Sequence, residues 1–212
     1  MEMSLPTNQH HYLKYDVMQS ICNIVARCPV NMTEEDMFDC LKIKRRFPIN
    51  IKGADWNCPS LEVISQWGKL THEVFDADGY LIFDEWKKYH DMGFSSIISH
   101  ALDLTSELRY LDEELKKITG RPNYANLYFS RGSSDHAISF PHHNHNYEVV
   151  VKPIYGKYTW RINDEYMENE NKVIHLPKGT NHSVVDCPGP KLSLTLNFHD
   201  PVGFNDGSEA AD

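Results

Sequence analysis

Residues 141–162 read PHHNHNYEVVVKPIYGKYTWRI. This stretch places a histidine-rich turn before an apolar run at 147–151, and a turn at Gly156 before a second run at 157–162. Runs of the same kind occur elsewhere in the second half of the chain, at 125–129, 173–176 and 191–198. Several short strands separated by Gly and Pro turns are typical of β sandwiches and barrels. We therefore expect this half of the chain to form a β sandwich or barrel.

The last of these runs alternates residue by residue. One face carries the apolar side chains of Leu192, Leu194, Leu196 and Phe198. The other face carries the polar side chains of Ser193, Thr195 and Asn197. Alternation of this kind predicts a strand with one face against the core. The sequence leaves open whether the polar face points into a ligand cavity or into water.

The chain before residue 120 has a helical pattern. Thr33 and Asp36 form a capping-box signature for a helix that is expected to end near Phe47-Pro48. A second helix is expected from Ser60 to Leu70, and a third over residues 105–119, with Gly120 as its C-terminal stop.

This pattern predicts three regions along the chain. Residues 1–120 form a mainly helical N-terminal region that packs on the barrel. Residues 121–200 form the β-barrel core, and residues 201–212 form a disordered tail. No internal repeat occurs.

Composition excludes several classes of protein. The 212 residues carry a net charge of −9, which disfavours binding to nucleic acid, and no apolar run is long enough to span a membrane. Five cysteines without a CxxC pair favour neither a disulfide framework nor a cysteine zinc site. Because the N-terminus lacks an apolar signal-peptide core, we expect a cytoplasmic protein.

Histidine is the unusual residue type in this chain. Six of the twelve histidines fall between His136 and His182. His143 and His145 are two residues apart, so on a strand both imidazoles would point to the same face. His182 follows the turn Pro177-Lys-Gly-Thr-Asn and can come from a neighbouring strand. Three imidazoles around one divalent ion, with positions left open for water or substrate, are typical of a catalytic metal site.

Further motifs surround these histidines in a fixed order. They are Asn126-Leu-Tyr128, Pro141-His-His143-Asn-His145, Gly156-Lys-Tyr-Thr-Trp160 and Leu176-Pro-Lys-Gly-Thr-Asn-His182. Over residues 120–198 the chain resembles the cupin superfamily. It is most similar to the JmjC-like, cupin-4 type branch of ribosomal-oxygenase-like Fe(II)/2-oxoglutarate oxygenases. The resemblance implies a mainly β fold with α, a double-stranded β-helix (jelly-roll cupin) preceded by a helical N-terminal region.

The resemblance also implies an iron centre and a cosubstrate. Fe(II) would be bound by His143, His145 and His182, and 2-oxoglutarate would lie near Asn126, Tyr128, Tyr158, Ser193, Thr195 and Asn197. The family hydroxylates protein or peptide side chains, so we expect a protein, peptide or small-molecule substrate. Two positions depart from the family pattern. His145 stands where the family has a metal-binding Asp, and Tyr158 stands where it has a Lys that pairs with the far carboxylate of 2-oxoglutarate.

Several alternatives remain at this stage. Glu148 is a candidate fourth ligand, or else a solvent-facing strand residue. Three imidazoles also accept divalent ions other than Fe(II). The chain could be a three-His cupin dioxygenase that chelates its substrate without 2-oxoglutarate, or a noncatalytic cupin that binds a metal or a small molecule. Pairing of sheet edges would produce a homodimer.

Overall fold

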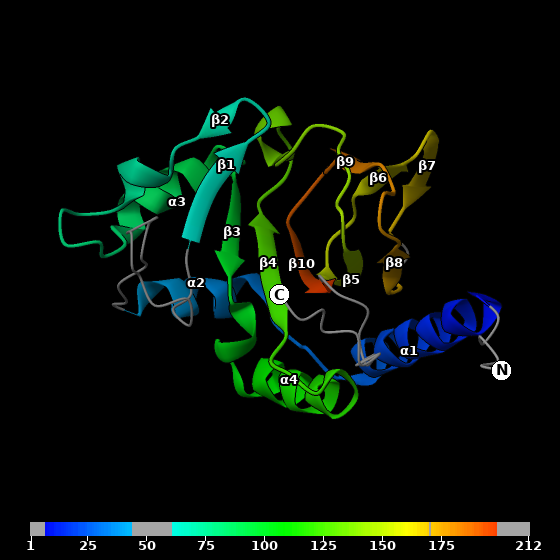
Figure 1. The fold of residues 1–212 in the computed structure, drawn as a ribbon. Helices are drawn as coiled ribbons and strands as arrows, with labels where there is room; N and C mark the ends of the chain where they lie inside the picture. The colour runs from blue at the N-terminus through cyan, green and yellow to red at the C-terminus, as the bar shows by residue number, and fades with distance from the viewer. Residues whose placement is uncertain (1–6, 44–60, 170, 199–212) are drawn as a thin grey trace, which may run out of the picture.

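A computed structural model describes residues 7–43, 61–169 and 171–198 (Figure 1). The helices are α1 (Thr7–Arg27), α2 (Glu34–Lys42), α3 (Phe83–Asp91) and α4 (Ser106–Thr119), with short 3-10 turns η1 (Thr71–Val74), η2 (Ala101–Asp103) and η3 (Asp135–Ala137). The strands are β1 (Leu61–Ser65), β2 (Gly68–Lys69), β3 (Ser95–Ser99), β4 (Tyr124–Ser130), β5 (Glu148–Tyr155), β6 (Thr159–Ile162), β7 (Glu165–Glu168), β8 (Ile174–Leu176), β9 (His182–Asp186) and β10 (Lys191–Phe198). No helix within these described ranges is both long enough and apolar enough to cross a bilayer.

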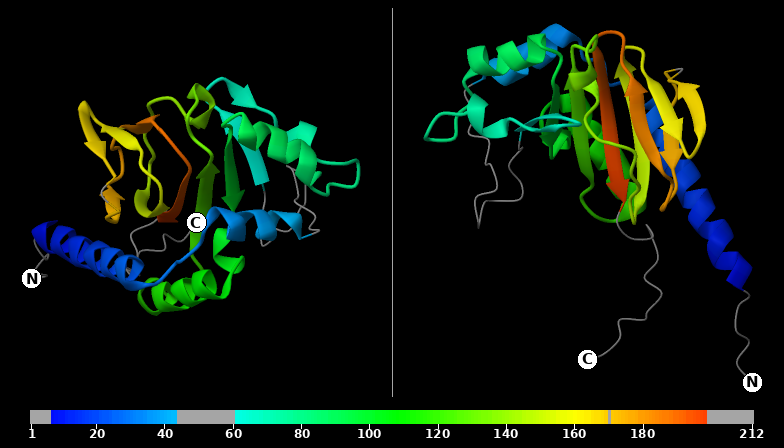
Figure 2. Two further views of the ribbon diagram at one scale, coloured as in Figure 1. Left: turned by 180° about the vertical axis from the view of Figure 1, so that it is seen from behind. Right: turned by 90° about the horizontal axis from the view of Figure 1, so that it is seen from above.

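The strands form two antiparallel sheets that face each other (Figure 2). One sheet has the order β2-β1-β3-β4-β10-β5-β8, and the other has the order β7-β6-β9. Side chains from β4, β5, β8 and β10 line a cavity together with side chains from β6 and β9, so the cavity lies between the two sheets. The fold is mainly β with α, a jelly-roll arrangement of two antiparallel sheets with helices in its N-terminal part, and the predicted fold class is confirmed.

Strand β10 separates the helical side of the large sheet from the cavity side. Its leucines belong to the main core, which also contains apolar side chains of all four helices. Ser193 and Thr195 point the other way and line the cavity. Strand β5 alternates in the same sense, since Val150 lies in the main core while Val149 and Val151 line the cavity. Two of the three polar residues on this face of β10, Ser193 and Thr195, therefore point into the cavity.

Two helical predictions are confirmed at the level of their caps. Thr33 caps α2, accepting a hydrogen bond from the backbone N–H of Asp36, whose carboxylate in turn accepts from the backbone N–H of Thr33. Helix α4 is capped by Thr105 and ends at Gly120, which takes the left-handed conformation (φ 68°). Helix α2 ends at Lys42, and the expected end at Phe47-Pro48 and the cap at Ser60 lie outside the described residues, as does the predicted tail 201–212.

The predicted helix over residues 61–70 is wrong. Residues 61–65 form strand β1, which pairs with β2 and β3, and Trp67 lies in the exposed turn between β1 and β2. Buried side chains occupy both faces of β1, so its apolar pattern fits the period of a helix as well as that of a strand. Strands β1–β3 extend the large sheet from within the N-terminal region, and helices α1 and α3 were not predicted.

Candidate metal centre

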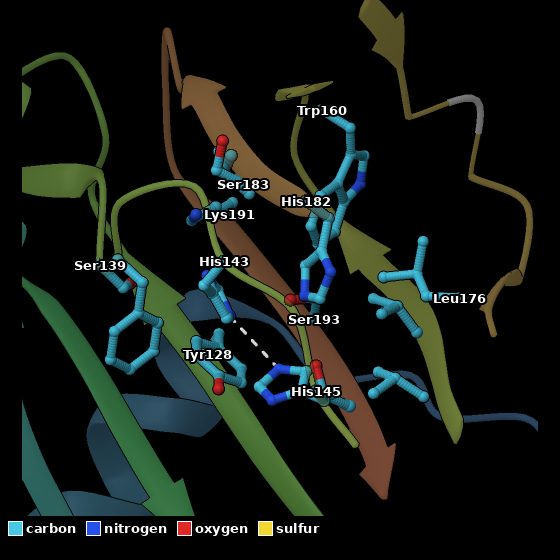
Figure 3. A pocket seen from close by; sticks show the side chains of 15 residues that line it. Tyr128, Ser139, His143, His145, Trp160, Leu176, His182, Ser183, Lys191 and Ser193 are labelled. Atoms are coloured by element: carbon cyan, nitrogen blue, oxygen red, sulfur yellow. Dashed lines mark hydrogen bonds between the residues drawn. The ribbon is translucent and has the colours of Figure 1, made fainter. Parts of the chain in front are cut away.

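The three predicted imidazoles lie together among the side chains that line the cavity (Figure 3). Their nearest ring nitrogens all lie within 4.8 Å of one another, and the Nε2 atoms of His143 and His145 are 3.2 Å apart. No other group of three His, Cys, Asp or Glu side chains within the described residues has this spacing.

The main chain holds two of these histidines in register. The backbone N–H of His143 donates to the carbonyl of His182 (3.1 Å), and the N–H of His182 donates to the carbonyl of His143 (2.7 Å). The N–H of Gly179 donates to the carbonyl of His145 (2.8 Å). The prediction that His143 and His145 lie on a strand is wrong, since both lie in the loop before β5 and only His143 forms a bridge, to β9. The loop nevertheless brings their rings to the same side.

Hydrogen bonds to carbonyl groups determine which ring nitrogens face the centre. The Nδ1 atom of His143 lies 2.8 Å from the carbonyl oxygen of Pro141, and the Nδ1 atom of His182 lies 2.9 Å from that of Thr180. A carbonyl oxygen only accepts, so each Nδ1 carries the proton and each Nε2 keeps its lone pair. Burial lowers the pKa of His182. The hydrogen bond to the carbonyl of Thr180 raises this pKa, and the nearby His143 and His142 lower it further. The neutral form required of a metal ligand is thereby favoured.

These distances fit a first-row divalent ion. With metal–nitrogen bonds of about 2.1 Å, two nitrogens 3.2 Å apart subtend about 100° at the metal, between octahedral and tetrahedral angles. At angles of about 90–110° two nitrogens on one ion lie about 3.0–3.4 Å apart, so an ion would draw a pair that is 4.8 Å apart inward by more than about 1 Å. The three imidazoles therefore form a candidate metal site whose ligand atoms are already gathered within 4.8 Å.

Lys191, at the start of β10, lines the same cavity and was missed by the sequence analysis. Its side chain is 3% exposed, and within the described part of the chain it forms no ion pair with a carboxylate. Its ammonium lies 5.3 Å from the centre of the Tyr158 ring. Burial lowers the pKa of Lys191, a shift that Cys187 partly opposes. The signal was present in the sequence, because Lys191 has the same strand parity as Ser193 and Thr195.

The other predicted contact residues divide into two groups. Tyr128, Ser193 and Thr195 line the cavity, whereas Asn126, Tyr158 and Asn197 are not among the lining residues. Burial, with a smaller contribution from Tyr147, raises the pKa of Tyr128 to about 12, and the hydrogen bond with Asn126 partly opposes the shift. Tyr158 is buried behind Lys191, and burial raises the pKa of its hydroxyl.

Glu148 lies away from the three imidazoles. Its neighbours Val149 and Val151 line the cavity, while the Glu148 carboxylate lies 2.8 Å from Nε2 of His175 on β8. The structure therefore does not bring Glu148 to the candidate metal centre as a fourth ligand.

Apolar side chains close the rest of the cavity, which has a volume of about 60 Å³. The lining residues other than the histidines and Lys191 are Tyr128, Ser139, Phe140, Val149, Val151, Trp160, Leu176, Ser183, Val184, Ser193 and Thr195. None of them is acidic. The cavity thus combines three metal-ligating groups and one ammonium with hydroxyl groups and an apolar wall.

No family model matches this chain, and no curated protein matches it. Three similar solved structures illustrate its structural likenesses. An RmlC-like cupin from Shewanella frigidimarina is 14% identical with a TM-score of 0.32, over 37% of this chain and 67% of that chain. A DMSP lyase from Ruegeria pomeroyi is 16% identical with a TM-score of 0.32, over 42% of this chain and 41% of that chain. A variant of the salicylate 1,2-dioxygenase from Pseudoaminobacter salicylatoxidans is 12% identical with a TM-score of 0.32, over 36% of this chain and 21% of that chain.

Proposed function

We propose that this protein is an Fe(II)-dependent oxygenase of the cupin type that uses 2-oxoglutarate as cosubstrate. A single observation carries the proposal. One cavity holds three imidazoles with their Nε2 atoms turned inward and a buried ammonium, and its lining contains no carboxylate.

The charges in this cavity favour an anionic ligand. A divalent ion at the imidazoles and the ammonium of Lys191 would together place three positive charges in a site with no acidic side chain. Buried charges are strongly disfavoured unless they are paired. 2-Oxoglutarate carries two carboxylates, so its far carboxylate can pair with Lys191 while its keto-acid end lies at the imidazoles. Lys191 thereby supplies the cation that the family carries at the position of Tyr158.

The remaining residues have roles that follow from their chemistry. When bound, the iron supplies Lewis acidity and redox chemistry. Lys191 holds the far carboxylate, and the hydroxyls of Ser193 and Thr195, on the same face of β10, can donate hydrogen bonds to it. The apolar wall formed by Val149, Val151, Leu176 and Val184 excludes water from the reacting groups. The hydroxylated substrate would be a protein or peptide side chain or a small molecule.

An anaerobic titration tests the proposal. Metal-free protein is titrated with Fe(II) and then with 2-oxoglutarate while the visible absorption spectrum is recorded. We expect a new charge-transfer band that is absent in His143→Ala. His142→Ala is the matched control, because His142 lies beside the site and its Nδ1 contacts Ser183 rather than the other imidazoles. If wild-type protein binds iron but shows no band, 2-oxoglutarate is not the cosubstrate.

A second candidate function is favoured by the ligand set itself. Three imidazoles without a carboxylate suit a cupin dioxygenase that chelates its substrate directly and does not use 2-oxoglutarate. In that case Lys191 would bind a carboxylate of the substrate. Oxygen consumption that needs iron but not 2-oxoglutarate, and that disappears in His182→Ala without loss of fold, would select this alternative. An iron-loaded protein that consumes no oxygen with either class of compound would indicate a noncatalytic cupin.

A further inference from the structure

Strand β7 lies at the outer edge of the small sheet and pairs only with β6 among the described residues (Figure 2). All four of its residues are exposed, and Tyr166 and Met167 are 69% and 40% exposed. Edge strands are normally protected by Lys, Pro or a bulge, or by being very short. The sequence Glu-Tyr-Met-Glu contains neither Lys nor Pro, and its pairing with β6 runs from Glu165 to Glu168 without a bulge. The large sheet, in contrast, ends in the two-residue β2 and the three-residue β8.

The register of β7 shows which backbone groups point outward. A two-residue turn, with Asn163 at φ 53°, joins Ile162 to Glu165. In an antiparallel ladder, pairs that exchange hydrogen bonds alternate with pairs whose N–H and C=O groups point away. The pair next to the turn, Ile162 and Glu165, exchanges hydrogen bonds, and the N–H of Asn169 donates to the carbonyl of Tyr158 (3.0 Å). The alternation therefore leaves the backbone N–H and C=O groups of Tyr166 and Glu168 facing outward.

The hairpin is anchored at both ends. At the turn, the N–H of Asn163 donates to the carbonyl of Asn181 (2.7 Å). At the base, the side chain of the buried Asn169 accepts from the N–H of Tyr158 (2.7 Å) and donates to the carbonyl of Gly156 (3.1 Å). A binding edge that is already ordered loses little conformational entropy when a partner is added.

The charges around this edge select its partner. The small sheet and its hairpin turn carry four acidic side chains, Asp164, Glu165, Glu168 and Asp186. Their one basic residue, Arg161, already pairs with Asp164 (2.9 Å). A second copy of β7 would bring a second set of these acidic side chains to the same edge, and like charges on neighbouring strands are destabilising. A basic strand meets no such repulsion.

We propose that the outer edge of β7 is a docking site for a basic peptide segment in extended conformation, which adds as a fourth strand to the small sheet. The segment would pair with the backbone groups of Tyr166 and Glu168 and place its basic side chains near the glutamates. Strand β6, which contributes Trp160 to the cavity wall, pairs with the inner side of β7, so one strand would separate the docked segment from the cavity wall. The docking edge shares no residue with the metal centre and stands independently of the oxygenase proposal.

The test uses a fluorescein-labelled hexapeptide of alternating lysine and valine, with binding to metal-free full-length protein followed by fluorescence anisotropy. We expect binding that weakens with added salt and is at least about tenfold weaker in Tyr166→Pro, which removes one outward N–H and is tolerated at a strand edge. Tyr166→Ala, the matched control, keeps the N–H and should retain most of the affinity. The same peptide N-methylated on alternate residues, and a glutamate–valine peptide, should not bind.

Three outcomes would overturn the proposal. The first is that wild-type protein does not bind the peptide, and the second is that Tyr166→Pro and Tyr166→Ala bind it equally. The third is that wild-type protein is a dimer and Tyr166→Pro is a monomer, which would show that a second copy of the chain pairs with this edge. If Tyr166→Pro does not fold, Glu168→Lys and the N-methylated peptide carry the test in its place. Because metal is absent throughout, failure here is distinguishable from failure of the iron titration.

Discussion

Replacing Lys191 by Met should raise stability and weaken 2-oxoglutarate binding at the same time. Lys191 is 3% exposed and pairs with no carboxylate in the described part of the chain, so the folded protein buries an ammonium that lies 5.3 Å from the centre of the Tyr158 ring. Burying an ion costs several kcal/mol, and a desolvated cation–π contact returns about 2 kcal/mol. We expect Lys191→Met to stabilise the fold by about 1–3 kcal/mol, which corresponds to a rise in Tm of about 2–12 °C.

The loss of binding follows from the same side chain. A hydrogen bond to a charged group contributes about 1.5–3 kcal/mol, so losing the ammonium should weaken 2-oxoglutarate binding about 10- to 150-fold. Metal binding should change little, because Lys191 is not one of the three imidazoles. The assays are thermal unfolding of the metal-free protein and titration of 2-oxoglutarate into the iron-loaded protein without oxygen.

The pH dependence gives a second check on this reasoning. Burial lowers the pKa of Lys191 in the folded state below its unfolded value of 10.5. Between these two values the unfolded chain holds the extra proton, so wild-type stability rises with pH and the advantage of Lys191→Met shrinks. Lys157→Met is the matched control, because Lys157 is exposed and its loss should change stability by less than about 0.5 kcal/mol. A lower Tm for Lys191→Met, or an unchanged 2-oxoglutarate affinity, would refute the assignment of Lys191.

Two further predictions concern the turns and the histidines. Gly156→Ala should destabilise the fold by more than about 3 kcal/mol, because the new Cβ would lie 2.1 Å from the carbonyl oxygen of Pro190. In Gly179→Ala the new Cβ would meet no atom within 4 Å, so this variant should lose only about 1–2 kcal/mol of stability from backbone strain. Urea unfolding compares the two variants, and equal losses of stability would contradict the packing argument. For His182, whose pKa burial lowers below 6.5, the unfolded state takes up the proton first as pH falls, so metal-free protein should lose stability below about pH 6.5. His182→Gln should show a shallower decline in Tm between pH 7 and 5, and identical slopes would exclude this source.

The sequence predicts features that depend on residue type and local spacing. The alternation of β10 correctly separates Leu194 from Thr195, and the caps of α4 follow from Thr105 and Gly120. The proximity of His143 to His182 was expected from the motif order, but the loop that achieves it depends on backbone hydrogen bonds between distant segments. Local spacing carries no information about such bonds.

Other features depend on the tertiary structure. Residues 61–65 have an apolar pattern that fits a helix or a strand, and the pairing with β3 decides between them. Lys191 has the strand parity of a cavity residue, but lysine is rarely buried, and its burial depends on Tyr158 from the segment before β6. Glu148 is turned away from the imidazoles by its place on β5, where the neighbouring valines take the cavity side.

The reciprocal backbone hydrogen bonds between His143 and His182 separate metal loading from folding. In zinc fingers the unfolded chain gathers its ligands only when the ion binds, so removing the metal unfolds the protein. Here the main chain joins two of the imidazole-bearing residues before any ion arrives. The protein can therefore release one ion and take up another while it stays folded. Which ion it carries then depends on the intrinsic affinity of the site and on the supply of each metal. The metal content of a purified sample therefore depends on the growth medium as well as on the site.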